Sequence, residues 1–151
     1  MTVQFKATAA MVAICLSASA CNAATDRATA TTTAPSAPVE SLGSLIPTPT
    51  GTHQTRGPDA IADNGIHLHY QVDGAPSDVM TAYKSALENT GWSVTTIITS
   101  GGGGGGGATY TGTHGDAYGV FDGGGYEKNT YLDVCTWAAK PADPNCTRGE
   151  R

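Results

Sequence analysis

The chain has 151 residues, and its 8 Lys and Arg residues against 13 Asp and Glu residues give a formal net charge of −5. The sequence contains no basic run, so its charge argues against nucleic-acid binding and against electrostatic docking on an anionic membrane. Composition typical of a folded domain is confined to about ninety residues, and a domain of that size is marginally stable without an added crosslink.

The first twenty residues have the pattern of an export signal. Lys6 supplies a positive charge, and residues 7–16 form an apolar run of about ten residues, which is too short to span a bilayer. Small residues occupy positions 17–20, and Cys21 follows directly. We therefore expect residues 1–20 to be a signal peptide and the protein to be exported.

The cysteine after this signal determines whether a membrane anchor or secretion is predicted. Small residues directly before Cys21 resemble a bacterial lipoprotein signal, which implies cleavage before the cysteine and its lipidation, for example by palmitate. Ala18 stands where that signal prefers leucine. Ala18 and Ala20 also fit an ordinary signal peptidase site, and cleavage after Ala23 would remove Cys21. The expected location is the outer face of the cell membrane, reached through the N-terminal lipid, and otherwise the protein is secreted.

Residues 21–57 are rich in Ala, Thr, Pro and Ser. Such a segment buries too little apolar surface to order itself. We expect a disordered tether here, followed by a single small domain over residues 58–147.

The clearest periodicity in the domain begins at Ile66. Apolar and polar residues alternate from Ile66 to Val72, which is the pattern of a strand with one buried face. A helix of about fourteen residues is predicted to follow. Pro76 suits its first turn, and Ser77 or Asp78 can supply cap oxygens. Its apolar stripe consists of Val79, Met80, Tyr83, Ala86 and Leu87.

Gly91 is predicted to end this helix, and the residues after it favour strands. Residues 92–99 form the next strand, in which Trp92, Val94 and Ile98 would share one face. Further strands are predicted at residues 108–113, 118–122 and 130–137. The glycine run at 101–107 is expected to be a flexible hairpin loop, and glycines 123–125 a turn. The fold class is α+β, in the order β-α-β-β-β, with one helix packed on an antiparallel-dominated sheet of about four strands.

Three segments carry a resemblance to known proteins. They are the helix end at Gly91 and Trp92, the glycine run leading into residues 108–111, and residues 130–137 with the later Cys146. On these segments the chain resembles a loose group of uncharacterised actinobacterial, chiefly mycobacterial, exported proteins and lipoproteins. The resemblance implies an envelope location and no known activity, so it supplies no catalytic residues.

Two cysteines remain in the domain once the signal is removed. Because an exported chain meets an oxidising compartment, Cys135 and Cys146 are predicted to form a disulfide. Pro141 and Pro144 provide a turn that returns Cys146 to the strand. The loop-entropy model gives such a crosslink about 3 kcal/mol of stabilisation.

Two histidines on one strand are candidate metal ligands. His67 and His69 point to the same side, at about 6.5–7 Å between Cα atoms, and two imidazoles so placed can share a metal ion. His53 or His114 could add a third ligand. The alternative is that both histidines are polar residues facing solvent.

A set of aromatic residues is the second candidate site. These residues could line a groove for a sugar or peptide, or they could be core residues and cross-strand pairs. The set consists of Tyr110, Tyr118, Phe121, Tyr126, Tyr131 and Trp137.

Other motifs carry less chemistry. The glycine run lacks the Lys-Ser/Thr that a phosphate loop needs. Asp116, Asp122 and Asp133 could supply paired carboxylates, but the first two lie beside glycines, where Asp is an ordinary turn residue.

These patterns predict a non-catalytic lipoprotein of the cell envelope, with a binding, scaffolding or accessory role and no cofactor. Its partner would be an envelope protein or a glycan. The alternative is a secreted metal- or small-ligand-binding module that uses His67 and His69 or the aromatic face.

Overall fold

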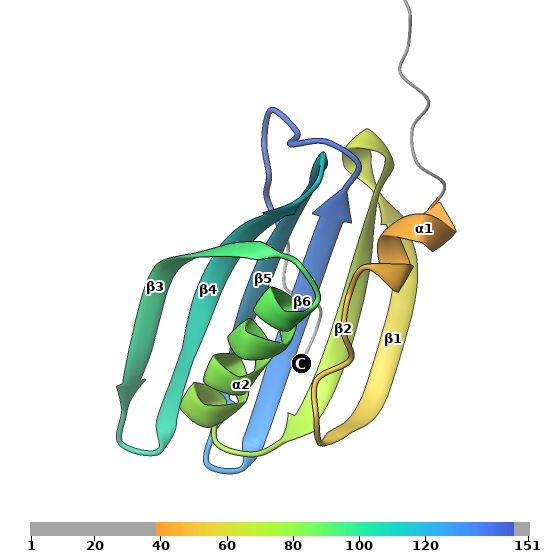
Figure 1. Ribbon diagram of the computed structural model, residues 1–151. Helices are drawn as coiled ribbons and strands as arrows, with labels where there is room; N and C mark the ends of the chain where they lie inside the picture. Colours follow the sequence, from red (N-terminus) through yellow and green to blue (C-terminus); the bar gives the residue numbers. More distant parts are fainter. Residues whose placement is uncertain (1–38, 147–151) are drawn as a thin grey trace, which may run out of the picture. The chain divides into compact units, whose positions relative to one another are not determined.

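Six antiparallel strands form one open sheet in the computed structural model, which describes residues 39–146 (Figure 1). The strand order is β1-β2-β6-β5-β4-β3, and every neighbouring pair is antiparallel. The last strand in the chain, β6, therefore lies inside the sheet, and β1 and β3 are its edges. In chain order the elements are α1 (Val39–Ser44), β1 (Thr52–Ile61), a 3₁₀ turn (Ala62–Asn64), β2 (Gly65–Asp73), α2 (Pro76–Asn89), β3 (Ser93–Gly102), β4 (Gly105–His114), β5 (Ala117–Tyr126) and β6 (Asn129–Trp137).

The helix α2 forms where the sequence predicts it. Pro76 occupies its first turn together with Asp78, whose negative charge suits the positive end of the helix dipole. Neither Ser77 nor Asp78 caps the helix: the cap position is Ala75, which makes no side-chain hydrogen bond. The helix ends before Gly91, whose φ of 97° is a conformation that glycine adopts without strain.

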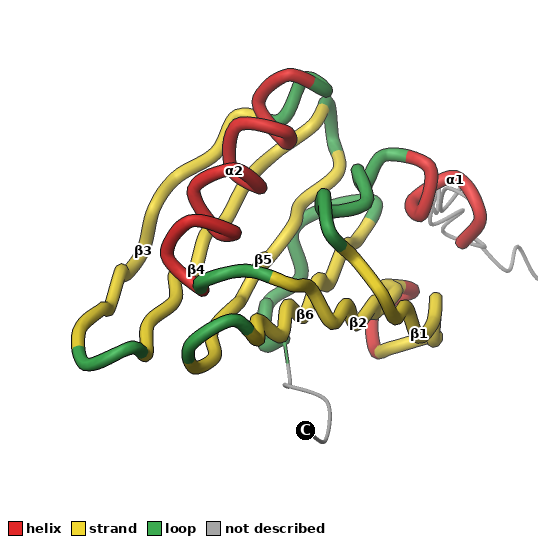
Figure 2. The backbone as a smooth tube through the Cα atoms, turned by 90° about the horizontal axis from the view of Figure 1, so that it is seen from below, coloured by secondary structure: helices red, strands yellow, loops and turns green. Residues whose placement is uncertain are grey.

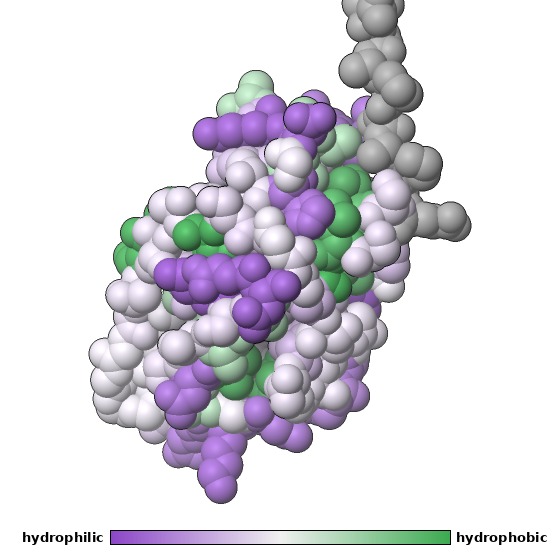
Figure 3. Space-filling view, viewed as in Figure 1, coloured by the Kyte–Doolittle hydropathy of each residue, from purple (hydrophilic) through white to green (hydrophobic). Residues whose placement is uncertain are grey.

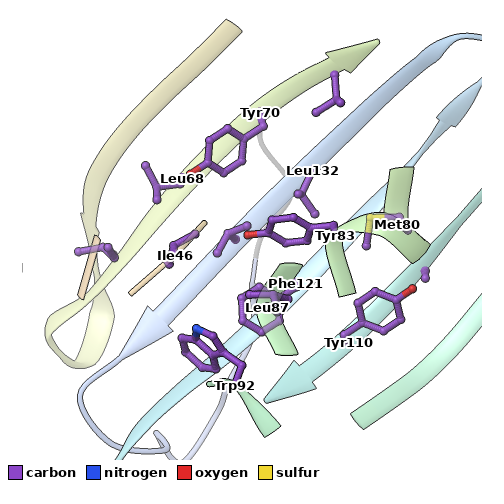
Figure 4. Close-up of a cluster of buried hydrophobic side chains, with 14 of the residues drawn as sticks. Ile46, Leu68, Tyr70, Met80, Tyr83, Leu87, Trp92, Tyr110, Phe121 and Leu132 are labelled. Carbon is purple, nitrogen blue, oxygen red and sulfur yellow. The ribbon is translucent and has the colours of Figure 1, made fainter. Parts of the chain in front are cut away.

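Both helices lie on the same face of the sheet, and the main core lies between them and the strands (Figure 1, Figure 4). Tyr83 and Leu87 of α2 reach down to Phe121 of β5, and the Trp92 ring meets the Phe121 ring edge-on at 5.1 Å. Leu42 of α1 joins the same cluster. The outer side of α2 is hydrophilic (Figure 3), so the helix has the one apolar stripe that its sequence predicts.

Three glycines let these side chains approach the sheet. Gly112 and Gly119 lie beneath Trp92 and Phe121, and a Cβ atom on Gly119 would lie 2.5 Å from the Phe121 ring. A Cβ atom on Gly123 would collide with the sulfur of Met80 in α2. Bare backbone at these positions therefore replaces part of the side-chain layer that a sheet usually presents to a helix.

The sheet is larger than the predicted sheet of about four strands. The five strand segments predicted from residue 66 onward form β2–β6, and β1 is a sixth strand. β1 lies largely in the segment predicted to be a tether, and the described structure includes α1 from the same segment. The ordered part of the chain thus begins before residue 58. The low-complexity composition of residues 21–57 did not indicate β1, because this exposed edge strand has little alternation of apolar and polar residues.

Two local predictions are corrected by strand geometry. A bulge between Thr96 and Ile98 shifts the register of β3, so Ile98 pairs with Thr109 and leaves the face that holds Trp92 and Val94. Ile98 is 60% exposed. Glycines 123–125 are not a turn but continue β5 as far as Tyr126. The run at 101–107 does contain the predicted hairpin, with its flanking glycines paired in β3 and β4.

The face without helices is covered in part by the end of the chain. The predicted disulfide between Cys135 and Cys146 is present, with the two Cα atoms 5.5 Å apart. It holds the segment after β6 against this face, opposite α2 (Figure 2). A second apolar cluster forms there from Tyr118, Val120, Cys135 and Trp137, with Ile61 and Cys146 against it.

One polar atom in the main core offers a test of this packing. The Tyr83 hydroxyl is buried and has no hydrogen-bond partner among the described residues. Burial, together with the nearby Tyr70, raises the pKa of Tyr83 well above its usual value, so the neutral hydroxyl is held in apolar surroundings.

We predict that Tyr83→Phe leaves the free energy of unfolding unchanged within about 1 kcal/mol or raises it, because no hydrogen bond is lost. Thr130→Val is the matched control: its hydroxyl donates to the Gly74 carbonyl at 2.9 Å, so its loss should cost about 1 kcal/mol. Urea unfolding measures both. A Tyr83→Phe variant less stable than Thr130→Val would show that the hydroxyl has a partner.

Candidate functional site

A row of polar side chains crosses the helix-free face of the sheet. The strand registers place Arg56, His69, Asp133, Asp122 and Thr109 side by side on β1, β2, β6, β5 and β4. Directly opposite residues in antiparallel strands share a face, so the five side chains form one line. This line is the centre of the candidate site.

Asp133 is the hub of the row. One carboxylate oxygen, Oδ1, lies 2.9 Å from Nε2 of His67 and 2.9 Å from Nδ1 of His69. The side chains of His69 and Asp133 are each only 4% exposed. The His69 ring stacks against Tyr131 at 6.2 Å, and its second nitrogen, Nε2, is buried without a hydrogen-bond partner among the described residues. His69 is therefore a buried network residue and not a solvent-facing one.

Asp122 lies opposite Asp133 and is buried at the base of a hollow. It accepts a hydrogen bond from the Thr109 hydroxyl at 2.6 Å. The hollow has a volume of about 290 Å³ and forms because the strands at this end of the sheet carry glycines. Its lining consists of Ile98, Ser100, Gly106, Gly107, Ala108, Thr109, Asp122, Gly123, Gly124 and Gly125. We call it the glycine hollow.

A second hollow lies at the other end of the same face, beneath the C-terminal segment. It has a volume of about 240 Å³ and is lined by Ile61, Ala62, Asp63, His67, Cys135, Trp137, Asp143 and Asn145. We call it the disulfide hollow. His67 belongs both to this hollow and to the Asp133 network.

In the structure His67 and His69 both contact Asp133. Neither His53 nor His114, the candidates for a third metal ligand, joins them. His53 is exposed and its Nδ1 lies 3.3 Å from Asp73. The His114 ring lies against Trp92, 5.7 Å between centroids. A metal ion held by His67 and His69 would thus depend on Asp133 for a further ligand, and that metal site stays a prediction.

The candidate aromatic residues do not share one face. Tyr110 and Phe121 lie in the main core beneath α2, whereas Tyr118 and Trp137 lie in the cluster under the C-terminal segment. Tyr131 is half-buried beside His69. Tyr126, at the end of β5, is exposed. Most of the set therefore serves packing, and no single groove collects it.

In the sequence, Asp122 and Asp133 are candidate paired carboxylates, and Asp122, at the end of the strand predicted at residues 118–122, has the glycine neighbour typical of a turn residue. The signal for the site is that His67, His69 and Asp133 are polar residues alternating with apolar ones on β2 and β6, but it becomes visible only when the register pairs His69 with Asp133. Asp116, the third carboxylate, lies in the turn between β4 and β5, away from the row.

No family model, curated protein or solved structure matches the chain. Within residues 39–146, no helix is long and apolar enough to cross a membrane. Cys21 lies outside the described residues.

We predict that Asp133→Asn lowers the free energy of unfolding at neutral pH by about 1.5–3 kcal/mol, because buried His69 and half-buried His67 both lose a charged acceptor. Asp73→Asn is the matched control, since it alters a second His–Asp pair whose carboxylate is 75% exposed; its effect should stay within about 0.5 kcal/mol. Chemical denaturation compares them. Equal losses in the two variants would contradict the central role of Asp133.

Proposed function

We propose that this protein is a non-catalytic binding module of the cell envelope that holds a small hydroxyl-rich ligand, such as a sugar, in the glycine hollow. The observation that supports the proposal is a buried carboxylate, Asp122, at the base of an open hollow whose floor is bare backbone. Ligand sites commonly combine a concave, largely apolar surface with a few fixed polar groups.

The groups in the hollow match a sugar hydroxyl better than a simple cation. Asp122 accepts hydrogen bonds, while the hydroxyls of Thr109 and Ser100 both donate and accept. A ligand hydroxyl can satisfy both kinds of group, whereas a cation satisfies acceptors alone. The exposed Ile98 provides an apolar side chain for the C–H face of a sugar ring, and the glycines leave room for the ring beside it.

The same lining argues for binding without catalysis. Asp122 is the one titratable side chain among the residues that line the glycine hollow. Its neighbour Asp133 is engaged by His67 and His69. Hydrolysis of a glycosidic bond uses two carboxyl groups that flank the bond, and the lining of this hollow supplies one.

The location is part of the proposal. We propose export and attachment to the outer face of the membrane through a lipid on Cys21, with the domain carried by the low-complexity segment that follows. Cys21 would otherwise be an odd thiol in an exported protein. The ligand would then be an envelope glycan or a free sugar.

A titration with glucose, galactose, mannose and arabinose, followed by amide NMR, tests the site. We predict that at least one sugar shifts the amide signals of Gly107 and Gly124. Asp122→Asn should weaken this binding because it removes the charged acceptor. Gly124→Ala should weaken it because the added methyl group narrows the lining, where it would lie 3.0 Å from the Gly106 carbonyl oxygen.

Each variant has a matched control. Asp116→Asn changes an exposed turn carboxylate, and Gly101→Ala adds a methyl group where no atom lies within 4 Å; both should bind like the wild type. If no sugar shifts these signals, or if Asp122→Asn binds as tightly as Asp116→Asn, the proposed ligand class is wrong.

We also predict that the wild-type protein incorporates a fatty-acid analogue when expressed in a bacterium that processes lipoproteins, and that Cys21→Ala does not. Labelling followed by membrane fractionation measures this. Persistent labelling of Cys21→Ala, or an unlabelled wild type, would leave plain secretion as the better account.

A further inference from the structure

Beside the disulfide hollow lie three atoms that could bind a metal once the disulfide is reduced. A ring nitrogen of His67 and the sulfur atoms of Cys135 and Cys146 all lie within 4.8 Å of one another. They are the one group of three such ligands found among residues 39–146. Two sulfurs and an imidazole are a donor set that suits zinc.

The surroundings of this group resemble those of a metal site in two respects. His67 and Cys135 line an existing hollow of about 240 Å³, so an ion and a solvent molecule have room beside them. Asp133 engages Nε2 of His67 at 2.9 Å. With Nε2 engaged by Asp133, the metal would bind Nδ1 of His67, and a carboxylate bound to a histidine ligand fixes the ring orientation and strengthens the ligand.

We propose that reduction of the Cys135–Cys146 disulfide converts this group into a zinc site. A dithiol reductant gives up two electrons and two protons and becomes a disulfide. The S–S bond breaks, and each cysteine sulfur takes up one proton. Zn²⁺ then replaces the two thiol protons, which pass to solvent, and binds both thiolates and the lone pair of His67.

The positions of the two cysteines favour this conversion. Cys135 is fixed inside the sheet on β6 between β2 and β5, and its register partner on β2 is His67. Cys146 is half-buried on the irregular segment after β6, so it can move when the S–S bond breaks. Ligand atoms around tetrahedral zinc lie roughly 3.3–3.8 Å apart, so the two sulfurs must separate after the S–S bond breaks, and the position of Cys146 on an irregular segment allows this.

The two thiolates carry two negative charges, which neutralise the charge of Zn²⁺. His67 contributes as a neutral imidazole, and the fourth tetrahedral position is left to solvent. The same cysteines thus crosslink the oxidised chain and bind metal in the reduced chain. This inference does not depend on the glycine hollow, because the two hollows share no lining residue.

The experiment compares the oxidised and reduced forms of the purified chain. Dithiothreitol reduces the disulfide and is removed by gel filtration under argon, and zinc affinity is then measured by competition with a chromogenic chelator. Co²⁺ in place of zinc reports thiolate ligands directly, through a sulfur-to-cobalt charge-transfer band. We expect one zinc ion per reduced chain, the cobalt band, and neither in the oxidised chain.

Variants assign the ligands. Loss of an outer-shell partner typically lowers metal affinity by about 10–100-fold, and His67→Ala should lower zinc affinity by more because it removes a direct ligand. The Cys135→Ser, Cys146→Ser double variant should lose the cobalt band. His53→Ala is the control and should bind like the wild type, because His53 lies on β1 beside Asp73. Sugar titration of the oxidised chain is a separate readout that zinc-site variants should leave unchanged.

Three results would overturn the inference: a reduced wild type without the cobalt band, a His67→Ala variant with wild-type affinity, or a reduced chain that is unfolded by circular dichroism and is not refolded by zinc. The first of these results needs no variant, so the proposal can be overturned even if the His67→Ala variant does not fold.

Discussion

A six-stranded sheet has two faces, and this chain has helices for one of them. α1 and α2 cover the first face and enclose the main core. The second face needs other cover for its buried groups, since unpaired polar groups away from water are costly. The disulfide-held C-terminal segment covers one end, and at the centre Asp133 shares a hydrogen bond with one nitrogen of each of His67 and His69. The disulfide hollow lies beneath this segment, and the glycine hollow lies beyond it.

The glycines of β4 and β5 have opposite roles on the two faces. Gly123 faces α2 and allows Met80 to approach the backbone, so its missing side chain increases packing. Gly124, its neighbour, faces the other way, and its missing side chain leaves a hollow beside Asp122. Because successive residues of a strand alternate between faces, one glycine run both tightens the core and opens the candidate site.

Periodicity made β2, α2 and β6 predictable, since each has a buried face that its sequence displays directly. The edge strands were harder: β1 has no apolar alternation, and the bulge in β3 moves Ile98 to a face that a regular strand would not give it. The site was harder still. His69 and Asp133 are 64 residues apart, and only the β2–β6 register makes them neighbours. The disulfide was predictable because it depends on cysteine number and compartment, which do not require a register.

The central place of β6 in the sheet also governs how the chain can assemble. β6 is the last strand, yet it lies between β2 and β5, so the β1–β2 hairpin and the β3–β4–β5 meander are joined in the sheet only through it. Neither part can close the core alone, because Leu132 and Val134 of β6 belong to the cluster beneath the helices. Folding must therefore wait for nearly the whole chain, and such non-local pairing is slow. For a chain exported as proposed, this delay would keep the polypeptide unfolded while it is threaded across the membrane.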